Sequence, residues 1–222
     1  MVNTEEIVAI IPVREGSQRV KLKNFREFSQ QKSITQIKID QLKDSKNITK
    51  IIVSSDSEKA KKIADESQVD FKLRPESFAN ATTPWAEVVS HVISEIPGNP
   101  IVVWALSTAP LFERFDEAIQ AYLNEKNIDS LVGVLPKKTF LLNKHGKGIN
   151  FNPGVWHPYS QELEPYYEVT GSVFIARKED MLRWSYWFGP KPYLFNLSLT
   201  ESVDIDEEED FKFAQKLFEA KV

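Results

Sequence analysis

The chain has 222 residues, of which 41% are hydrophobic, and its 28 basic and 32 acidic side chains leave a formal net charge of −4. This length and composition predict one folded domain with a sizeable core and exclude a disordered chain. The near-balanced charge predicts neither a nucleic-acid partner nor a membrane-surface partner, so any anion binding must be local. Because there is no cysteine, disulfides, thiolate catalysis and cysteine-based zinc sites are excluded.

The sequence offers no signal for membrane insertion or export. No apolar run approaches the roughly 20 residues that a membrane span needs. The N-terminal stretch MVNTEEIVAI lacks the basic region and the cleavage site of a signal peptide. We therefore expect a cytoplasmic protein.

Apolar runs alternate with amphipathic stretches along the first 136 residues. The patterns predict strands at 7–13, 50–56, 100–106 and 130–136, and helices at 33–42, 57–67, 84–96 and 114–125. The second of these helices has three candidate caps, Ser55, Asp56 and Ser57. Repeated β-α units of this length predict parallel strands joined by right-handed helical crossovers.

The pattern changes after Pro136. Residues 137–168 carry turn dipeptides and alternating stretches in place of long helices, which predicts an inserted arm or hairpin within a single domain of residues 1–222. Two more strands are expected at Gly171–Arg177 and Pro192–Ser198, and residues 207–220 predict a closing amphipathic helix.

A cationic loop, REGSQRVKLKN (Arg14–Asn24), follows the first strand directly. Ligands of open α/β sheets bind beyond the carboxyl ends of the strands. Gly16 would let successive N–H groups converge on an anion, and Ser17 adds a hydroxyl. The loop also supplies Arg14, Arg19, Lys21, Lys23 and Asn24. A triphosphate would offset the repulsion among these cations; the alternative is a solvated basic loop. The motif is neither G-x-x-x-x-G-K-[ST] nor G-x-G-x-x-G.

An acidic stretch, ESVDIDEEEDF (Glu201–Phe211), lies near the other end of the chain. In an extended backbone Asp204 and Asp206 face one side while Ile205 faces the other. Two close carboxylates are unfavourable unless a cation lies between them, and Mg²⁺ takes one or two carboxylates together with water and phosphate oxygens. The alternative is that Asp206 merely caps the last helix.

Weaker signals lie between these ends. Arg74 precedes Pro75 and is therefore held extended, so its side chain could reach a cleft. The segment 157–171 is rich in aromatic and hydrogen-bonding groups, which suits an organic ligand or a partner subunit equally. His145 and His157 lack the spacing of a helical zinc site, and we assign no metal to them.

Taken together, these motifs resemble the acylneuraminate cytidylyltransferase (CMP-N-acetylneuraminic acid synthetase) family. IIPVREGSQRVKLKN is similar to the family's IPARGGSKRIPGKN signature. The similarity continues in the family's order through VSSDSEKAKKIADE, LRPESFA, STAPLFERFDEAI, SQELEPYYEVTGSVFIARKEDML and ESVDIDEEEDFKFA. The resemblance implies a Rossmann-like nucleotide-diphospho-sugar transferase fold with a mixed, mostly parallel sheet. It also implies a homodimer in which an arm of each subunit reaches over its partner's active site.

The resemblance further implies a Mg²⁺-dependent enzyme of surface polysaccharide biosynthesis that uses CTP. The anomeric hydroxyl of a nine-carbon or related 2-keto sugar acid would attack the α-phosphate of CTP, and pyrophosphate would leave. Matching positions imply nucleotide contacts from Arg14, Gly16, Ser17, Arg19, Lys23, Asn24 and Arg74, metal binding by Asp204 and Asp206, and sugar contacts from Leu106, Gln161, Tyr167 and Gly171. The residues expected at the reaction centre are Arg14, Lys23, Asp204 and Asp206.

The chain departs from the family pattern at four positions. Leu106 replaces the glutamine of the family's QPTSP motif, Glu15 replaces a glycine, Gln18 replaces a lysine and Ala81 replaces a frequent aspartate. Two alternatives follow: a nucleotidyltransferase of the same fold that acts on another sugar acid such as Kdo, and a catalytically weak nucleotide-binding relative. Because Kdo-transferring relatives have a different motif at the third strand, a sialic-, legionaminic- or pseudaminic-like acid ranks above Kdo.

Overall fold

Strand β1 (Ile7–Pro12) is an interior strand of the main sheet, as its continuous apolar sequence predicts. The structure is a computed structural model that describes residues 5–17, 19–80 and 82–221. Two of the four departures from the family pattern, Gln18 and Ala81, therefore lie outside the described residues.

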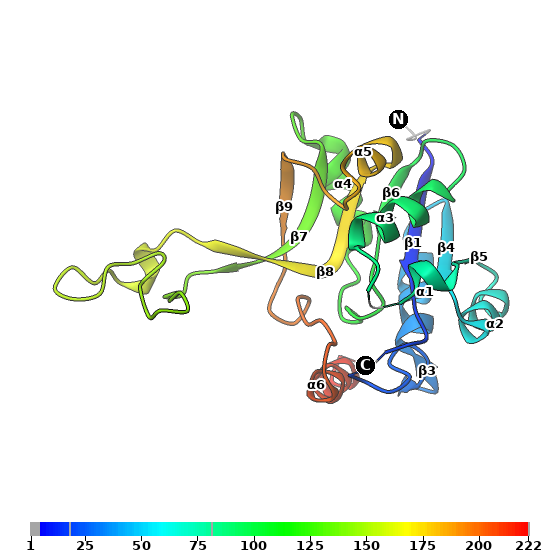
Figure 1. Ribbon diagram of the computed structural model, residues 1–222, viewed down its shortest axis with the longest axis horizontal. Helices are drawn as coiled ribbons and strands as arrows, with labels where there is room; N and C mark the ends of the chain where they lie inside the picture. The colour runs from blue at the N-terminus through cyan, green and yellow to red at the C-terminus, as the bar shows by residue number, and fades with distance from the viewer. Residues whose placement is uncertain (1–4, 18, 81, 222) are drawn as a thin grey trace.

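One mixed sheet organises the described part of the chain (Figure 1), in the order β5-β4-β1-β6-β8-β7-β9. Its other strands are β4 (Lys50–Ser55), β5 (Asp70–Leu73), β6 (Ile101–Trp104), β7 (Ser130–Lys137), β8 (Tyr166–Arg177) and β9 (Pro192–Asn196). In the register, Ile10 of β1 lies opposite Ile52 of β4 and Trp104 of β6. Strand β8 runs antiparallel to β6 and β7, and every other pairing in this sheet is parallel. The expected mixed, mostly parallel sheet is confirmed.

Helices cover both faces of this sheet. Along β1, Ile7, Ala9 and Ile11 pack on one face, and Val8 and Ile10 pack on the other, because successive side chains of a strand point in opposite directions. The first face is covered by α1 (Ile34–Lys43), α2 (Glu58–Glu66) and α4 (Phe115–Asn124), and the second by α3 (Trp85–Ser94) and α5 (Lys178–Trp184).

A third apolar cluster joins the two ends of the chain. Helix α6 (Glu208–Glu219) packs on a small hairpin of β2 (Glu27–Ser29) and β3 (Lys32–Ser33), which comes directly after the cationic loop. The rings of Phe28 and Phe211 meet edge to face, with centroids 5.2 Å apart. In Figure 1 red α6 and the blue hairpin labelled β3 lie at the same end of the molecule.

The helix caps settle two expectations from the sequence. Ser57, one of the three candidates, caps α2 by accepting a hydrogen bond from the Lys59 amide. Glu207 caps α6, and Asp210 completes the capping box. The alternative in which Asp206 merely caps the last helix is therefore wrong.

Strands β7 and β8 continue beyond the sheet as an antiparallel ribbon in which Val134–Lys137 pair with Tyr166–Val169. Figure 1 shows residues 138–165 at the end of this ribbon, far from the sheet. Strand β8 thus begins five residues before the expected Gly171. No helix in the described ranges is long and apolar enough to cross a membrane.

Candidate nucleotide-binding site

A cavity of about 420 Å³ opens at the carboxyl ends of β1, β5 and β6. It is lined by nine of the residues that the sequence singles out: Arg14, Ser17, Arg19, Lys23, Asn24, Arg74, Leu106, Asp204 and Asp206. Basic groups from the start of the chain and acidic groups from its end therefore share one cavity, as the sequence predicts.

Asn24 anchors the cationic loop to the scaffold. Its side-chain amide donates to the carbonyl of Arg14 at 3.1 Å and accepts from the Ser107 hydroxyl at 3.0 Å. Ser107 belongs to the segment that follows β6 in the chain. The Thr35 hydroxyl of α1 donates to the Asn24 carbonyl at 2.8 Å. Because Asn24 is buried, these bonds fix the loop with little competition from water.

Two cations of the loop, Lys23 and Arg19, contact the acidic segment, Glu201–Phe211. The Lys23 ammonium donates to the carbonyl of Ile205 at 2.5 Å and lies 3.7 Å from the Asp206 carboxylate. Burial lowers the pKa of Lys23, while Asp206 and Asp204 act against this shift. Arg19 pairs with Asp206 at 2.7 Å and with Glu207 at 3.0 Å, and all three side chains are more than half exposed.

The Asp204 carboxylate lies in surroundings that disfavour its charged form. Burial raises its pKa, and the neighbouring Asp206 adds to this shift, while a hydrogen bond from Thr108 and the charge of Lys23 oppose it. Its Oδ1 atom is buried and has no hydrogen-bond partner among the described residues. A buried acceptor without a partner beside a second carboxylate is what a divalent cation would satisfy.

Gly171 lets Asp204 and Leu106 approach the sheet. A Cβ atom at this position would lie 2.9 Å from Oδ2 of Asp204 and 2.9 Å from Cδ1 of Leu106. A larger residue would therefore displace both side chains. The Leu106 side chain and the Asp204 carboxylate therefore both lie against Gly171.

The donor set suits a hard cation that keeps open positions. In residues 5–17, 19–80 and 82–221 no group of three or more His, Cys, Asp or Glu side chains is arranged to hold a metal. Asp204 and Asp206 would therefore supply two ligands and leave the other positions to water and phosphate oxygens, the arrangement that Mg²⁺ prefers.

Arg74 lines the cavity directly after the end of β5. It is buried, and its guanidinium donates to the carbonyl of Val13 at the end of β1. Its Nε atom has no hydrogen-bond partner in the described ranges. Burial lowers the pKa of Arg74, Asp56 opposes this shift, and the charge of Arg14 adds to it. A polyanion in the cavity would relieve the repulsion between the two guanidinium groups.

Glu15 does not place its charge in the cavity. Its carboxylate accepts from the Ser57 hydroxyl at 2.6 Å and from the Lys59 ammonium at 2.5 Å, both at the start of α2. The bond from Lys59 is the largest cause of the lowered pKa of Glu15. This departure from the family pattern is therefore neutralised locally and leaves the cationic loop intact.

Two expectations about the cationic loop need correction. Gly16 does not line the cavity, and its φ is not positive. The residue of the loop with a positive φ is Leu22, at 52°. The glycine therefore supplies no left-handed turn, and its nucleotide contact stays a prediction. Lys21 is exposed and lies outside the cavity lining.

Comparison with known proteins identifies the family. A family model described as "Cytidylyltransferase" matches residues 8–222. The chain belongs to the cytidylyltransferase family. It is similar to the N-acylneuraminate cytidylyltransferase of Escherichia coli O18:K1:H7, with 26% identity over 94% of this chain and 51% of that protein. This chain thus spans about half the length of the first relatives that it matches.

Other family members are similar over their full length. The CMP-N,N'-diacetyllegionaminic acid synthase of Legionella pneumophila is 27% identical over 96% of both chains, and the pseudaminic acid cytidylyltransferase of Campylobacter jejuni is 25% identical over 95% of both. Among solved structures, a CMP:2-keto-3-deoxy-manno-octonic acid synthetase complexed with CTP gives a TM-score of 0.71 at 11% identity, over 98% of this chain and 100% of that one. At that identity the likeness shows the fold alone, and the expected nucleotidyltransferase fold is confirmed.

Two residues that the family resemblance places near the sugar lie far from this cavity. Gln161 lies on the arm, where its carbonyl accepts from Lys138 at 2.9 Å. Tyr167 is exposed on the ribbon, opposite Pro136. Neither lines the cavity. The ribbon and residues 138–165 at its end extend away from the sheet (Figure 1).

The cavity also contains residues to which the sequence reasoning gave no role. Thr108 bonds the Asp204 carboxylate through its hydroxyl and accepts from the Ile205 amide at 2.8 Å through its carbonyl. Thr108 lies in Leu106-Ser107-Thr108-Ala109-Pro110, just beyond the carboxyl end of β6. This position indicates a residue near the ligand, because ligands bind beyond the carboxyl ends of the strands. An apolar side of the cavity is formed by Phe78, Ala79, Trp85 and Val88. Trp85 follows Pro84 at the start of α3, so it read as an ordinary helix residue.

Proposed function

We propose that the protein transfers CMP from CTP to the anomeric hydroxyl of a 2-keto sugar acid and releases pyrophosphate. The observation that carries this proposal is that Arg14, Lys23, Asp204 and Asp206 share a single cavity in a chain of the cytidylyltransferase family. The new bond joins the sugar oxygen to the α-phosphorus, and the hydroxyl proton is lost to water. The bond from the α-phosphorus to the bridging oxygen breaks, and pyrophosphate leaves with that oxygen. Since the donor is CTP, the reaction belongs in the cytoplasm.

The cations of the loop bind and orient the phosphates. Phosphoryl transfer depends mainly on positioning the reactants and on stabilising charge. Lys23, held by the Ile205 carbonyl, has a fixed position from which it can contact a phosphate oxygen. Arg19 is exposed and would exchange Asp206 and Glu207 for the leaving pyrophosphate.

Asp204 and Asp206 would hold Mg²⁺, as the partnerless Oδ1 atom of Asp204 supports. When bound, Mg²⁺ would neutralise phosphate charge that the cationic loop leaves uncompensated. The bond from the Thr108 hydroxyl keeps the Asp204 carboxylate turned into the cavity.

The sugar acid is proposed to be sialic-, legionaminic- or pseudaminic-like. Relatives that are similar over their full length carry the names of legionaminic and pseudaminic acid enzymes. Leu106 against Gly171 gives the acceptor side an apolar surface where the family usually has an amide. A Kdo-type acceptor is the second candidate.

The arm is proposed to pack on a second copy of this chain. Its tip exposes Val155 by 95%, Trp156 by 87% and Tyr159 by 77%, and exposed apolar groups in such number favour an interface. Gln161 and Tyr167, which lie far from their own cavity, could then reach the cavity of the partner. Trp156→Ser should shift the protein from dimer to monomer in light scattering, and a wild-type protein that is already monomeric would refute this arrangement.

A pyrophosphate-release assay tests the function. Each of the four nucleoside triphosphates is combined with N-acetylneuraminic, legionaminic, pseudaminic and Kdo acids in the presence of Mg²⁺. We expect release with CTP and one of the first three acids. Release with Kdo alone would select the second candidate, and no release with any combination would refute the proposed activity.

A further inference from the structure

Asp204 lies where two segments distant in sequence meet. The first follows β6 and comprises residues 105–114, and the second follows β9 and comprises residues 197–206. Thr108 of the first segment joins them beside the cavity, through its bonds to the Asp204 carboxylate and the Ile205 amide.

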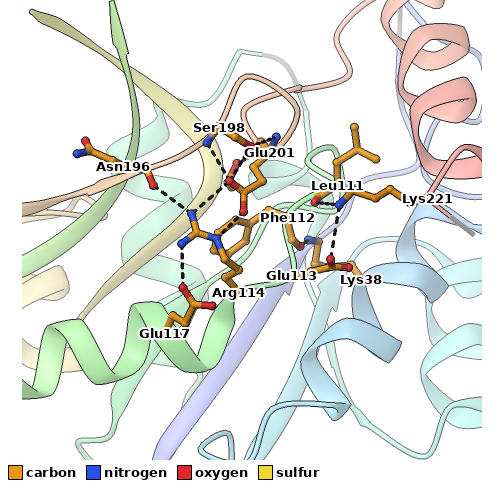
Figure 2. Close-up of polar contacts among 11 residues, drawn as sticks. Lys38, Leu111, Phe112, Glu113, Arg114, Glu117, Asn196, Ser198, Glu201 and Lys221 are labelled. Carbon is orange, nitrogen blue, oxygen red and sulfur yellow. Dashed lines mark hydrogen bonds and ion pairs between the residues drawn. The ribbon is translucent and has the colours of Figure 1, made fainter.

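A second connection between the same segments lies outside the cavity, at Arg114 (Figure 2). Its Nε and Nη2 atoms donate to the two carboxylate oxygens of Glu201 at 2.5 and 3.2 Å. Nη2 also donates to the carbonyl of Asn196 at 3.1 Å, and Nη1 pairs with Glu117 at 2.9 Å. The guanidinium lies over the Phe195 ring at 4.8 Å. A planar, bidentate contact of this kind fixes distance and orientation together.

Glu201 passes this constraint to the turn before Asp204. Its Oε2 atom accepts from the amide and the hydroxyl of Ser198 at 2.8 and 2.7 Å, as Figure 2 also shows. Its carbonyl accepts from the Ser172 hydroxyl of β8 at 3.0 Å. The amide of Ser202 then bonds the carbonyl of Ser198 at 3.1 Å, which closes a single turn two residues before Asp204.

The segment that carries Arg114 is itself held from the core. Lys38 of α1 is buried, and its ammonium donates to the carbonyls of Ala109 and Phe112 at 2.9 Å each. Lys221 bonds the carbonyl of Leu111 at 3.3 Å on the same segment (Figure 2). Arg114 therefore extends from a fixed support, and the turn of Glu201 is the part that it positions.

We propose that Arg114 is a positioning residue that holds Asp204 in the geometry required to bind the divalent cation. Asp204 needs such a restraint because its carboxylate lies beside that of Asp206 with one buried oxygen unbonded, so a free segment would relax away from the cavity. Thr108 restrains the segment on one side of Asp204 and Arg114, through Glu201, on the other. The inference rests on the proposed function, since it concerns the same carboxylates.

The test compares the affinity for CTP, measured by calorimetry without any sugar acid, in Mg²⁺ and in EDTA. In Arg114→Gln we expect the Mg²⁺-dependent gain in affinity to fall by about tenfold, while the affinity in EDTA stays within twofold of wild type. Amide exchange at Ser202, Val203 and Ile205 should become faster. Arg114→Lys should behave like Arg114→Gln, because an ammonium cannot make the bidentate contact.

Glu201→Gln removes the other side of the same contact and carries the test if Arg114→Gln does not fold. The double variant should resemble each single one, because all three break one interaction. Arg183→Gln is the matched control: Arg183 pairs with Asp180 at 3.0 Å on the surface of α5, and its loss should change neither quantity.

The outcomes separate this inference from the proposed function. A variant with faster amide exchange but an unchanged gain from Mg²⁺ would reduce Arg114 to a structural role and overturn the inference. Wild-type protein that binds CTP equally in Mg²⁺ and in EDTA would overturn the inference and leave nucleotide binding in place. Wild-type protein that binds no CTP would overturn both.

Discussion

Replacing Asp204 by asparagine should stabilise the free protein while abolishing its Mg²⁺-dependent activity. The carboxylate is raised in pKa by burial, then by Asp206, and its Oδ1 atom has no partner among the described residues. A carboxylate whose pKa is raised in the folded state loses folding free energy when it ionises. Asparagine keeps an oxygen for the Thr108 hydroxyl and removes the charge. We expect a gain of about 1 kcal/mol, which corresponds to a rise in Tm of about 2–4 °C for a domain of this size.

The stability gained by Asp204→Asn should depend on pH, and the raised pKa of Asp204 gives the direction of that dependence. Because the pKa of Asp204 is raised in the folded state, the folded protein retains the proton to a higher pH than the unfolded chain does. The stability of the wild type therefore falls as pH rises through that interval, and the penalty is fully present above the raised pKa. The advantage of Asp204→Asn should be largest near pH 7 and should vanish below pH ~3.8, the ordinary pKa of aspartate.

Thermal melting and pyrophosphate release provide the assay. Asp204→Asn should lose at least about 100-fold in rate, as expected when a principal group stabilising transition-state charge is removed. Mg²⁺ and CTP together should raise the Tm of the wild type and that of the variant much less, because a ligand stabilises only the state that binds it. Asp65→Asn, on the exposed surface of α2, is the matched control and should change neither quantity. A variant that melts lower than wild type and retains its activity would refute this reasoning.

Two further substitutions test other parts of the site, and a third tests a buried lysine of α1. Lys23→Ala should weaken CTP binding about tenfold or more, since it removes a largely buried cation from the cavity, and an unchanged calorimetric affinity would contradict the role of the loop. Leu106→Gln should raise activity on N-acetylneuraminic acid relative to the other acids; equal ratios of kcat/KM before and after would show that the acceptor side is determined elsewhere. Burial lowers the pKa of Lys38 to about 7, with Glu113 opposing, so the folded protein binds fewer protons than the unfolded chain between pH 7 and 10.5. Wild-type stability should therefore rise with pH relative to Lys38→Met, by up to about 1.4 kcal/mol per unit from pH 7 to 9, and a pH-independent difference in urea unfolding would contradict this.

Strands β1, β4, β6 and β7 could be predicted because buried strands have short, mainly apolar sequences. IVAIIP becomes β1 with five of its six residues buried, and KIIVSS becomes β4 in the same way. The hairpin of β2 and β3 escaped prediction because strands of three and two residues leave no period to detect. The first half of β8 escaped for another reason: its side chains project from a ribbon with no core beneath it, so Tyr166 and Tyr167 are both exposed and the alternation is absent.

The site residues that could be predicted are likewise those next to elements with a core pattern. Arg14, Lys23 and Asp204 could be predicted to lie together because each follows or precedes an element whose place in the fold is fixed by a core pattern. Gln161 and Tyr167 could not be placed, because the ribbon follows an irregular register step between Val132 and Val134. Such irregularities bend a strand, so the sequence pattern alone does not give the direction of the ribbon. The buried Lys38 was also beyond prediction, since a lysine in an amphipathic helix normally lies on the solvent side.

The meeting of the two chain ends is maintained by packing, and this leaves the charges free for a ligand. The ion pair of Arg19 with Asp206 is more than half exposed, and such pairs contribute about 0–1 kcal/mol. The edge-to-face contact of Phe28 and Phe211 lies in a buried cluster, where each large apolar side chain contributes about 1.5–3 kcal/mol. Phosphate and metal can therefore separate Arg19 from Asp206 without separating the cationic loop from the acidic segment. A site held together by its own salt bridges would open when its substrate competed for them.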